Sequence, residues 1–242
     1  MATIVFQHSD IGRPGRLGLT LRDHGHRLKI IRPDRGEAIP PDFDDVDGVI
    51  SMGGPQSTVD AGSRPEWMEE EMAFLKEAHE RALPVIGVCL GHQMLAVALG
   101  GETGRMAKPE VGFYPVDITV PGQTEHVLAG ISWRSRQFCH HGDHVTKAPP
   151  GAVVLAKSEL CPVQAFRAGL RTYAFQYHFE ADRQHAMQIA ESEPDLLHKA
   201  GHTEQEIAAQ ADECYEQFAR LADRLCVNIA TLVALVGRRH LV

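Results

Sequence analysis

The sequence predicts an α/β protein whose doubly wound, mainly parallel sheet carries an antiparallel extension. Three observations support this fold class. Up to Gly101, short apolar runs alternate with segments of helical periodicity, as they do in βαβ units. One of these runs leads directly into a helix at Cys89. Gly87 and Gly91 stand two residues before and two residues after this cysteine. Beyond Gly101 the segments alternate in polarity, which is typical of antiparallel strands.

The first half of the chain supplies the parallel strands. Four short apolar runs are expected as strands: Thr3–Phe6, Arg27–Ile31, Val46–Ser51 and Val85–Val88. The loop Gly12–Gly18 matches no phosphate-binding pattern, so it should lead into a helix that ends near His24. Ser63–Glu66 has the form of a capping box and should open an amphipathic helix through Arg81. The expected buried residues of this helix are Trp67, Met72, Phe74, Leu75 and Ala78.

The second half supplies antiparallel strands and then helices. The expected strands are Val111–Val120, Trp133–Phe138, Val153–Lys157, Val163–Arg167 and Arg171–His178, the last two as a hairpin. Helices should cover 183–191 and the segment from Thr203, with a break at Pro194. We therefore expect a domain over residues 1–182 and a helical extension over residues 183–242. The extension would pack on the same domain or offer a surface for a homodimer.

Composition narrows the classes of function. The 242 residues carry a formal net charge of −8, which gives no electrostatic reason to expect nucleic acid or a membrane surface as partner. Five cysteines, at positions 89, 139, 161, 214 and 226, are odd in number and unlike a disulfide framework. No secretory signal is visible, and the apolar stretch Val227–Val236 is too short to span a bilayer. These features predict a cytoplasmic protein.

The segment Gly87–Gly91 is a thiol version of the Gly-x-Ser-x-Gly nucleophile elbow. In such an elbow a strand reverses into a helix at a residue of strained backbone, and the flanking glycines have no Cβ to collide. Cys89 would then lie at a helix N-terminus, where the helix dipole favours the thiolate. The Leu90 amide would face the same space. The alternative is a buried structural cysteine, against which the two glycines argue.

Two further segments should meet the elbow at the carboxyl edge of the sheet. Gly53–Pro55 follows a buried strand as an amide-exposing turn, so the Gly54 N–H could be a second donor to an oxyanion. His178 and Glu180 close the last strand, and residues two apart on a strand point the same way. Glu180 could then hold the imidazole of His178 while its other nitrogen faces the thiol. The alternative is an ordinary surface pair.

A metal site must be weighed for the segment Cys139–His144. It contains metal-ligand residue types: Cys139, His140, His141, Asp143 and His144. It has no second pair of ligands at a familiar spacing, and the chain has no His-Glu-x-x-His motif. We therefore expect a loop here, and we expect neither a metal nor a cofactor.

These motifs resemble those of class I, triad-type glutamine amidotransferases, above all the glutaminase part of GMP synthetase. The motifs that carry the resemblance stand in the family's order: Gly53–Pro55, Gly87–Gln93, His141–Asp143 and Gln176–Glu180. The resemblance covers residues 3–182 and implies a flavodoxin-like fold. It also implies Cys89 as nucleophile, His178 as base and acid, and Glu180 as the orienting carboxylate.

The resemblance implies the remaining site residues as well. The amides of Gly54 and Leu90 would form the oxyanion hole. The implied substrate contacts are Gly53, Pro55 and Gln93, with His141 and Asp143 at the border of the glutamine pocket. Phe179 stands where the family usually has proline, so we expect a looser fit of Glu180 to His178.

Three functions remain open on the sequence. The first is hydrolysis of glutamine through a cysteine thioester, with ammonia passed to a separate synthetase subunit, because this chain has no ATP-binding signature. The second is a stand-alone γ-glutamyl peptidase or hydrolase with the same chemistry. The third is a non-catalytic regulatory or binding subunit, in which Phe179 has disabled the triad.

Overall fold

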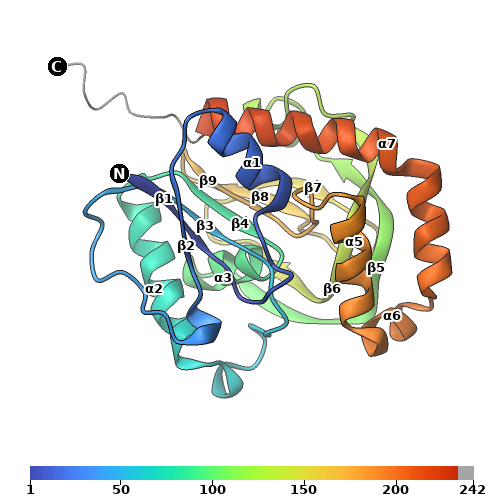
Figure 1. The fold of residues 1–242 in the computed structure, drawn as a ribbon, viewed down its shortest axis with the longest axis horizontal. Coiled ribbons are helices and arrows are strands. Elements are labelled where there is room, and N and C mark those ends of the chain that lie inside the picture. Colours follow the sequence, from blue (N-terminus) through green and yellow to red (C-terminus); the bar gives the residue numbers. More distant parts are fainter. Residues whose placement is uncertain (234–242) are drawn as a thin grey trace.

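The computed structural model describes residues 1–233, and it confirms the predicted α/β class with a mixed open sheet (Figure 1). The described sheet has nine strands in the order β2-β1-β3-β4-β9-β8-β7-β5-β6. They are β1 (Ala2–Phe6), β2 (Leu28–Ile31), β3 (Val46–Ser51), β4 (Val85–Val88), β5 (Glu102–Ile118), β6 (Arg134–Lys147), β7 (Val153–Lys157), β8 (Ala165–Ala168) and β9 (Thr172–Phe175). The first four and β9 pair in parallel, and the pairs from β9 to β6 are antiparallel.

Helices cover both faces of the sheet (Figure 1). They are α1 (Gly15–Asp23), α2 (Glu66–Glu80), α3 (Leu90–Ala98), α4 (Val120–Gln123), α5 (Arg183–Ser192), α6 (Pro194–Ala200) and α7 (Glu204–Asn228). Helices α1 and α5 contact α7 over one core, and α2 contacts α3 over the other. Strands β1, β3, β4 and β9 are therefore held between two apolar layers, and their carboxyl ends meet at one edge, where sites form in such sheets.

The ribbon formed by β5 and β6 is longer than the sequence indicated. Strand β5 begins at Glu102 instead of Val111, and β6 runs to Lys147, so Cys139–His144 lies within a strand and the expected loop is wrong. The pairing of the two strands shifts between Arg105 and Glu110. This irregularity breaks the alternation of polar and apolar residues, which explains why the pattern underestimated both strands.

Helix α2 begins without the expected capping box. It starts at Glu66 behind Pro65, which makes no side-chain cap. The Ser63 hydroxyl donates to the Asp60 carbonyl oxygen at 3.1 Å, so it serves the preceding turn instead of the helix. A capping box does form at α7, where Thr203 and Glu206 exchange hydrogen bonds.

The C-terminal helices pack on the sheet. Helix α7 contacts α1, β5 and β6, and Arg16 pairs with Asp223 across the first of these contacts. Near the end of α7 the buried Asn228 amide donates to Val127 O at 3.0 Å and to Ala129 O at 2.9 Å. A π-helical turn, Ile229–Val233, follows, and the rest of the apolar stretch to residue 236 lies outside the described residues. Among the helices of residues 1–233, none combines the length and the apolar character needed to cross a membrane.

We expect Asn228→Ala to lower the free energy of unfolding by about 1–3 kcal/mol, because the carbonyl oxygens of Val127, which is buried, and of Ala129 lose their donor. The matched control is Gln217→Ala on the exposed side of the same helix, which should change it by less than about 0.5 kcal/mol. Urea unfolding of both variants measures the difference. Equal midpoints would mean that the end of α7 does not unfold together with the sheet.

Candidate active site

Cys89 lies at the sharp turn between β4 and α3. Its φ of 52° and ψ of −104° are strained for a residue with a side chain, at a cost of about 1–3 kcal/mol. A Cβ on Gly87 would fall 2.6 Å from Gly91 O, and one on Gly91 would fall 2.1 Å from Ser51 O. The expected elbow geometry is therefore present, and backbone contacts require both glycines.

The imidazole of His178 lies beside the Cys89 side chain, whose thiol donates to His140 O at 3.7 Å. The Cβ that Gly53 lacks would fall 3.0 Å from His178 Cε1 and 3.5 Å from Cys89 Cβ. On the far side of the ring, His178 Nδ1 is 2.7 Å from Glu180 Oε1. All three side chains are buried. The fold thus brings together the thiol, the imidazole and the carboxylate that the sequence singled out.

The route by which Glu180 reaches His178 differs from the expectation. Strand β9 ends at Phe175, and the next five residues form a turn. The prediction that His178 and Glu180 point the same way because they share a strand is therefore wrong. The His178 N–H donates to Phe138 O at 2.8 Å, which ties this turn to β6. Phe179 is fully buried, edge-on to Phe175 with 5.1 Å between ring centroids. Aromatic packing therefore anchors the turn where the family usually has proline.

The protonation of His178 is set by its neighbours. Burial by itself would lower its pKa, but the charges of Glu180 and Cys89, with their hydrogen bonds, outweigh burial and raise the pKa well above the ordinary value. The imidazolium form is favoured as a result. A proton donor therefore stands beside the Cys89 sulfur.

Residues Met52–Pro55 form the turn after β3, which we call the glycine turn. Gly91 N–H donates to Met52 O at 3.1 Å, so the turn lies against the start of α3. The Cβ absent from Gly54 would fall 3.0 Å from a methyl carbon of Leu90. Leu90 N–H is the first of its helix and has no intrahelical acceptor. The Gly54 and Leu90 amides thus belong to adjoining segments.

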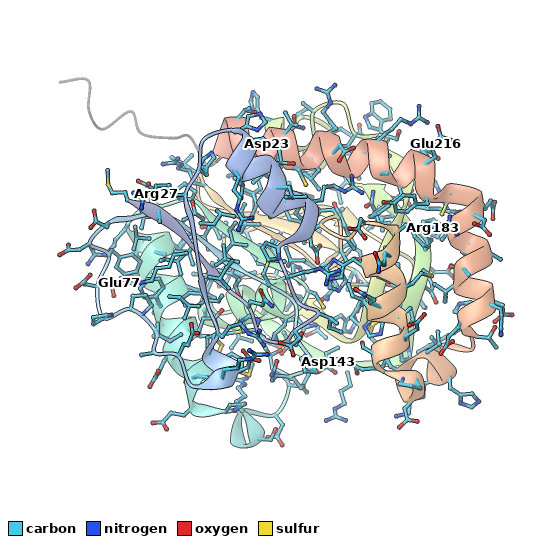
Figure 2. All side chains as sticks on the ribbon, in the orientation of Figure 1. Asp23, Arg27, Glu77, Asp143, Arg183 and Glu216 are labelled. Carbon is cyan, nitrogen blue, oxygen red and sulfur yellow. The ribbon has the colours of Figure 1, made fainter. Side chains whose placement is uncertain are left out.

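One cavity of about 450 Å³ gathers the expected residues. Every predicted site residue lines it except Glu180, which lies behind His178: Gly53, Gly54, Pro55, Cys89, Leu90, Gln93, His141, Asp143 and His178. Asp143 is labelled in Figure 2, and its neighbour Gly142 lies close to Leu196 at the start of α6. The cavity is also lined by residues that the sequence did not assign to the substrate site: Ser9, Ile11, Gly12, Gln56, Ser57, Arg105, His140, Gly142, Ile189, Ser192, Glu193 and Leu196.

The polar residues of the cavity wall are tied to one another. The Gln93 amide nitrogen donates to Asp143 O at 3.0 Å and to Gln176 Oε1 at 3.2 Å. The two ring nitrogens of His141 contact Asp143 O and Glu110, each at 3.0 Å. The Asp143 carboxylate accepts a hydrogen bond from Ser57. These side chains therefore form a prearranged wall.

Glu110, Cys139 and His141 bring three possible metal ligands within 4.8 Å of one another. The Glu110 carboxylate already accepts hydrogen bonds from His141 at 3.0 Å, from Gln164 at 2.7 Å and from Ser158 at 2.6 Å. A metal here would have to displace these bonds. The arrangement is explained by a closed hydrogen-bond network behind the cavity wall.

Two buried residues near the site were missed. His8 follows β1 at the same edge as the elbow, and its Nε2 is 2.9 Å from Glu71 of α2. The position of His8 directly after a predicted strand was an available signal. Glu71 falls on the apolar face of its helix, between Met68 and Leu75, where a carboxylate is rare without a partner.

The model of the family described as glutamine amidotransferase class-I matches residues 17–196. The glutamine amidotransferase-like protein YfeJ of Salmonella typhimurium is 32% identical over 160 residues, 65% of this chain and 66% of that protein. A subunit of the glutamine-hydrolysing GMP synthase of Pyrococcus furiosus is 33% identical over 180 residues, 72% of this chain and 87% of that subunit.

Solved structures agree with the sequence matches. The glutamine amidotransferase of Methylobacillus flagellatus superposes with a TM-score of 0.83 at 26% identity, covering 99% of this chain and 98% of that one. The family model spans most of the chain, and the related sequences and structures point the same way. The chain belongs to the class I glutamine amidotransferase family.

Proposed function

We propose that this protein hydrolyses a γ-glutamyl amide through a thioester on Cys89. The observation that carries the proposal is the contact of the Cys89 side chain with an imidazole that Glu180 holds from behind. A nucleophile, a base and an orienting carboxylate in this arrangement are the parts that covalent amide hydrolysis needs. Family membership supports the same reaction class.

The first step forms the thioester. The Cys89 thiolate adds to the γ-carbonyl carbon, and the π electron pair moves to the oxygen, where the Gly54 and Leu90 N–H groups would donate to it. As the C–N bond breaks, the His178 imidazolium gives its proton to the departing nitrogen. Glutamine would release ammonia at this stage.

The second step restores the enzyme. Neutral His178 takes a proton from water, whose oxygen attacks the thioester carbonyl. Glutamate leaves, and Cys89 regains its thiolate beside the imidazolium. We propose that Gly53, Pro55, Gln93, His141 and Asp143, which line the cavity, position the substrate.

Ammonia needs a consumer. Two related proteins are subunits of glutamine-hydrolysing GMP synthases. This relationship supports glutamine as the substrate and a separate synthetase subunit as the partner. The prediction of a cytoplasmic protein fits such a partner. The adjoining reading frame or a co-purified subunit would identify the acceptor.

A γ-glutamyl hydrolase is the second candidate, and the size of the cavity favours it. About 450 Å³ lies in the range of roughly 300–1,000 Å³ that holds ligands of drug size. Part of the cavity wall comes from α5, through Ile189, from α6, through Leu196, and from Glu193 between the two helices. We therefore propose that the extension expected over residues 183–242 packs, in its described part up to residue 233, on the domain of residues 1–182 and shapes the space beyond the scissile amide.

We expect iodoacetamide at neutral pH to alkylate Cys89 at least about tenfold faster than the other four cysteines. Burial raises the pKa of the other thiols, Cys139, Cys161, Cys214 and Cys226, so little of their thiolate form is present. Mass spectrometry of the digested protein, with Cys89→Ala as blank, measures each site. Equal rates at all five thiols would favour the third function, a non-catalytic subunit.

Glu180→Gln should move the alkaline limb of the kcat/KM profile to lower pH. The proton donor is the His178 imidazolium, which exists below its pKa and is lost as pH rises through it. The Glu180 charge raises that pKa, so removing the charge lowers it and brings the loss of activity to lower pH. Glu77→Gln, an exposed residue of α2 paired with Arg81, is the control and should leave the profile unchanged. An unmoved limb would contradict the role of Glu180.

Glutamine and a γ-glutamyl dipeptide distinguish the two candidate functions. If the extension shapes a subsite for a larger leaving group, the dipeptide should have a kcat/KM at least about tenfold above that of glutamine. The reason is that contacts to the leaving group beyond the amide stabilise the transition state relative to free enzyme and free substrate. Release of glutamate from both substrates is measured, with Cys89→Ala as blank. An inert dipeptide beside an active glutamine would exclude the peptidase and leave the glutaminase.

A further inference from the structure

Besides His178–Glu180 and His141–Glu110, a further buried histidine–glutamate pair, His8–Glu71, lies behind the glycine turn. His8 is 1% exposed and Glu71 is not exposed at all. The Cβ absent from Gly54 would fall 2.6 Å from the His8 Cβ, whereas the Cβ absent from Gly53 would point at His178. The glycine turn therefore lies between the His8 pair and the His178 pair, and of these two only the His178 pair takes part in the mechanism above.

Both ring nitrogens of His8 face acceptors. Nε2 is 2.9 Å from Glu71 Oε2, and Nδ1 is 3.0 Å from the Met52 carbonyl oxygen. A carbonyl oxygen only accepts, so Nδ1 carries a proton and donates to Met52 O. The Glu71 carboxylate at Nε2 favours a second proton there and hence the imidazolium form. Burial alone would lower the pKa of His8, but Glu71 and the backbone carbonyls raise it. The Trp67 ring stacks on this cation, with 5.2 Å between ring centroids.

The Met52 carbonyl is held by two donors that come from different elements. His8 Nδ1 reaches it from the end of β1, and Gly91 N–H reaches it from α3. Glu71 is fixed in turn by the Ser51 hydroxyl, which donates to its other oxygen at 2.7 Å. Two glycines follow Met52, and glycine restricts its own backbone least. The direction of the Gly54 N–H therefore depends on how firmly the Met52 carbonyl, which precedes the two glycines, is held.

We propose that His8 and Glu71 are positioning residues that hold the Met52 carbonyl and thereby aim the Gly54 N–H at the developing oxyanion. The inference rests on the proposed hydrolysis at Cys89. Neither side chain lines the cavity, so both act through the glycine turn and not on the substrate.

The decisive comparison is made in a Glu71→Gln background. In this background the side-chain oxygen introduced at position 71 can still accept from Ser51, and the side-chain nitrogen faces His8. No carboxylate is then left buried without a partner when His8 is replaced. In this background His8→Asn keeps an amide donor near the position of Nδ1, and His8→Leu has similar size without a donor. Of the two double variants, only the asparagine variant can donate to Met52 O.

We expect kcat of the leucine variant to be about 10–100-fold below that of the asparagine variant, as when an oxyanion donor is misplaced. KM should differ by less than about threefold, because the proposed substrate contacts of Gln93, His141 and Asp143 lie outside the glycine turn. Alkylation of Cys89 by iodoacetamide forms no oxyanion, so its rate should be equal in both variants and in the wild type. Glu69→Gln, an exposed carboxylate of α2, is the matched single control and should behave as wild type.

Hydrogen–deuterium exchange supplies a readout that needs no turnover. Amides of residues 52–57 should exchange faster in the leucine variant than in the asparagine variant. Equal exchange together with equal kcat would overturn the inference. A wild-type protein that hydrolyses neither glutamine nor a γ-glutamyl dipeptide would contradict the proposed function instead, and the exchange rates would still decide whether His8 holds the turn.

Discussion

The approach of Gly91 to the end of β3 is the contact on which the site depends. A Cβ there would fall 2.1 Å from Ser51 O, and the Gly91 N–H is bonded to Met52 O. Helix α3 thus begins against backbone, with no side chain between. To allow this approach the chain must reverse within one residue, and Cys89 takes the strained φ of 52°. The sulfur, the first amide of the helix and the glycine turn consequently share one small space.

The features that sequence analysis predicted correctly are local ones. Buried parallel strands appear as short β-branched runs, and the bounds expected for β3, β4 and β7 match the structure. The elbow is equally local, because strand, turn and helix fit within one continuous segment. The end of β9 could not be located in the same way. The alternation of apolar and polar residues continues beyond Phe175 through Tyr177 to Phe179, where the aromatic side chains pack in a turn and not along a strand.

Buried polar residues were harder to predict from the sequence than buried apolar strands. Glu71 was left out of the buried face of its helix, and Trp67, which was placed on it, is only half-buried. An apolar periodicity assigns a carboxylate to solvent unless its partner is known. Its partner, His8, is 63 residues away along the chain. The same holds for Glu110, which reaches His141 across the β5–β6 ribbon. Such pairs are set by tertiary structure, and a single sequence carries no record of them.

Stability alone does not account for two buried histidine–glutamate pairs around one turn. Desolvation of a buried ion pair roughly cancels its attraction, and apolar residues of similar volume often serve a core as well or better. Apolar residues could not donate to Met52 O, and they could not hold a proton next to the Cys89 sulfur. The two pairs differ in what they touch: His178 lies beside the Cys89 side chain, and His8 reaches the Met52 carbonyl oxygen of the glycine turn. We infer that the buried charged pairs position groups around the glycine turn. The apolar layers on both faces of the sheet supply the stability that offsets the cost of burying them.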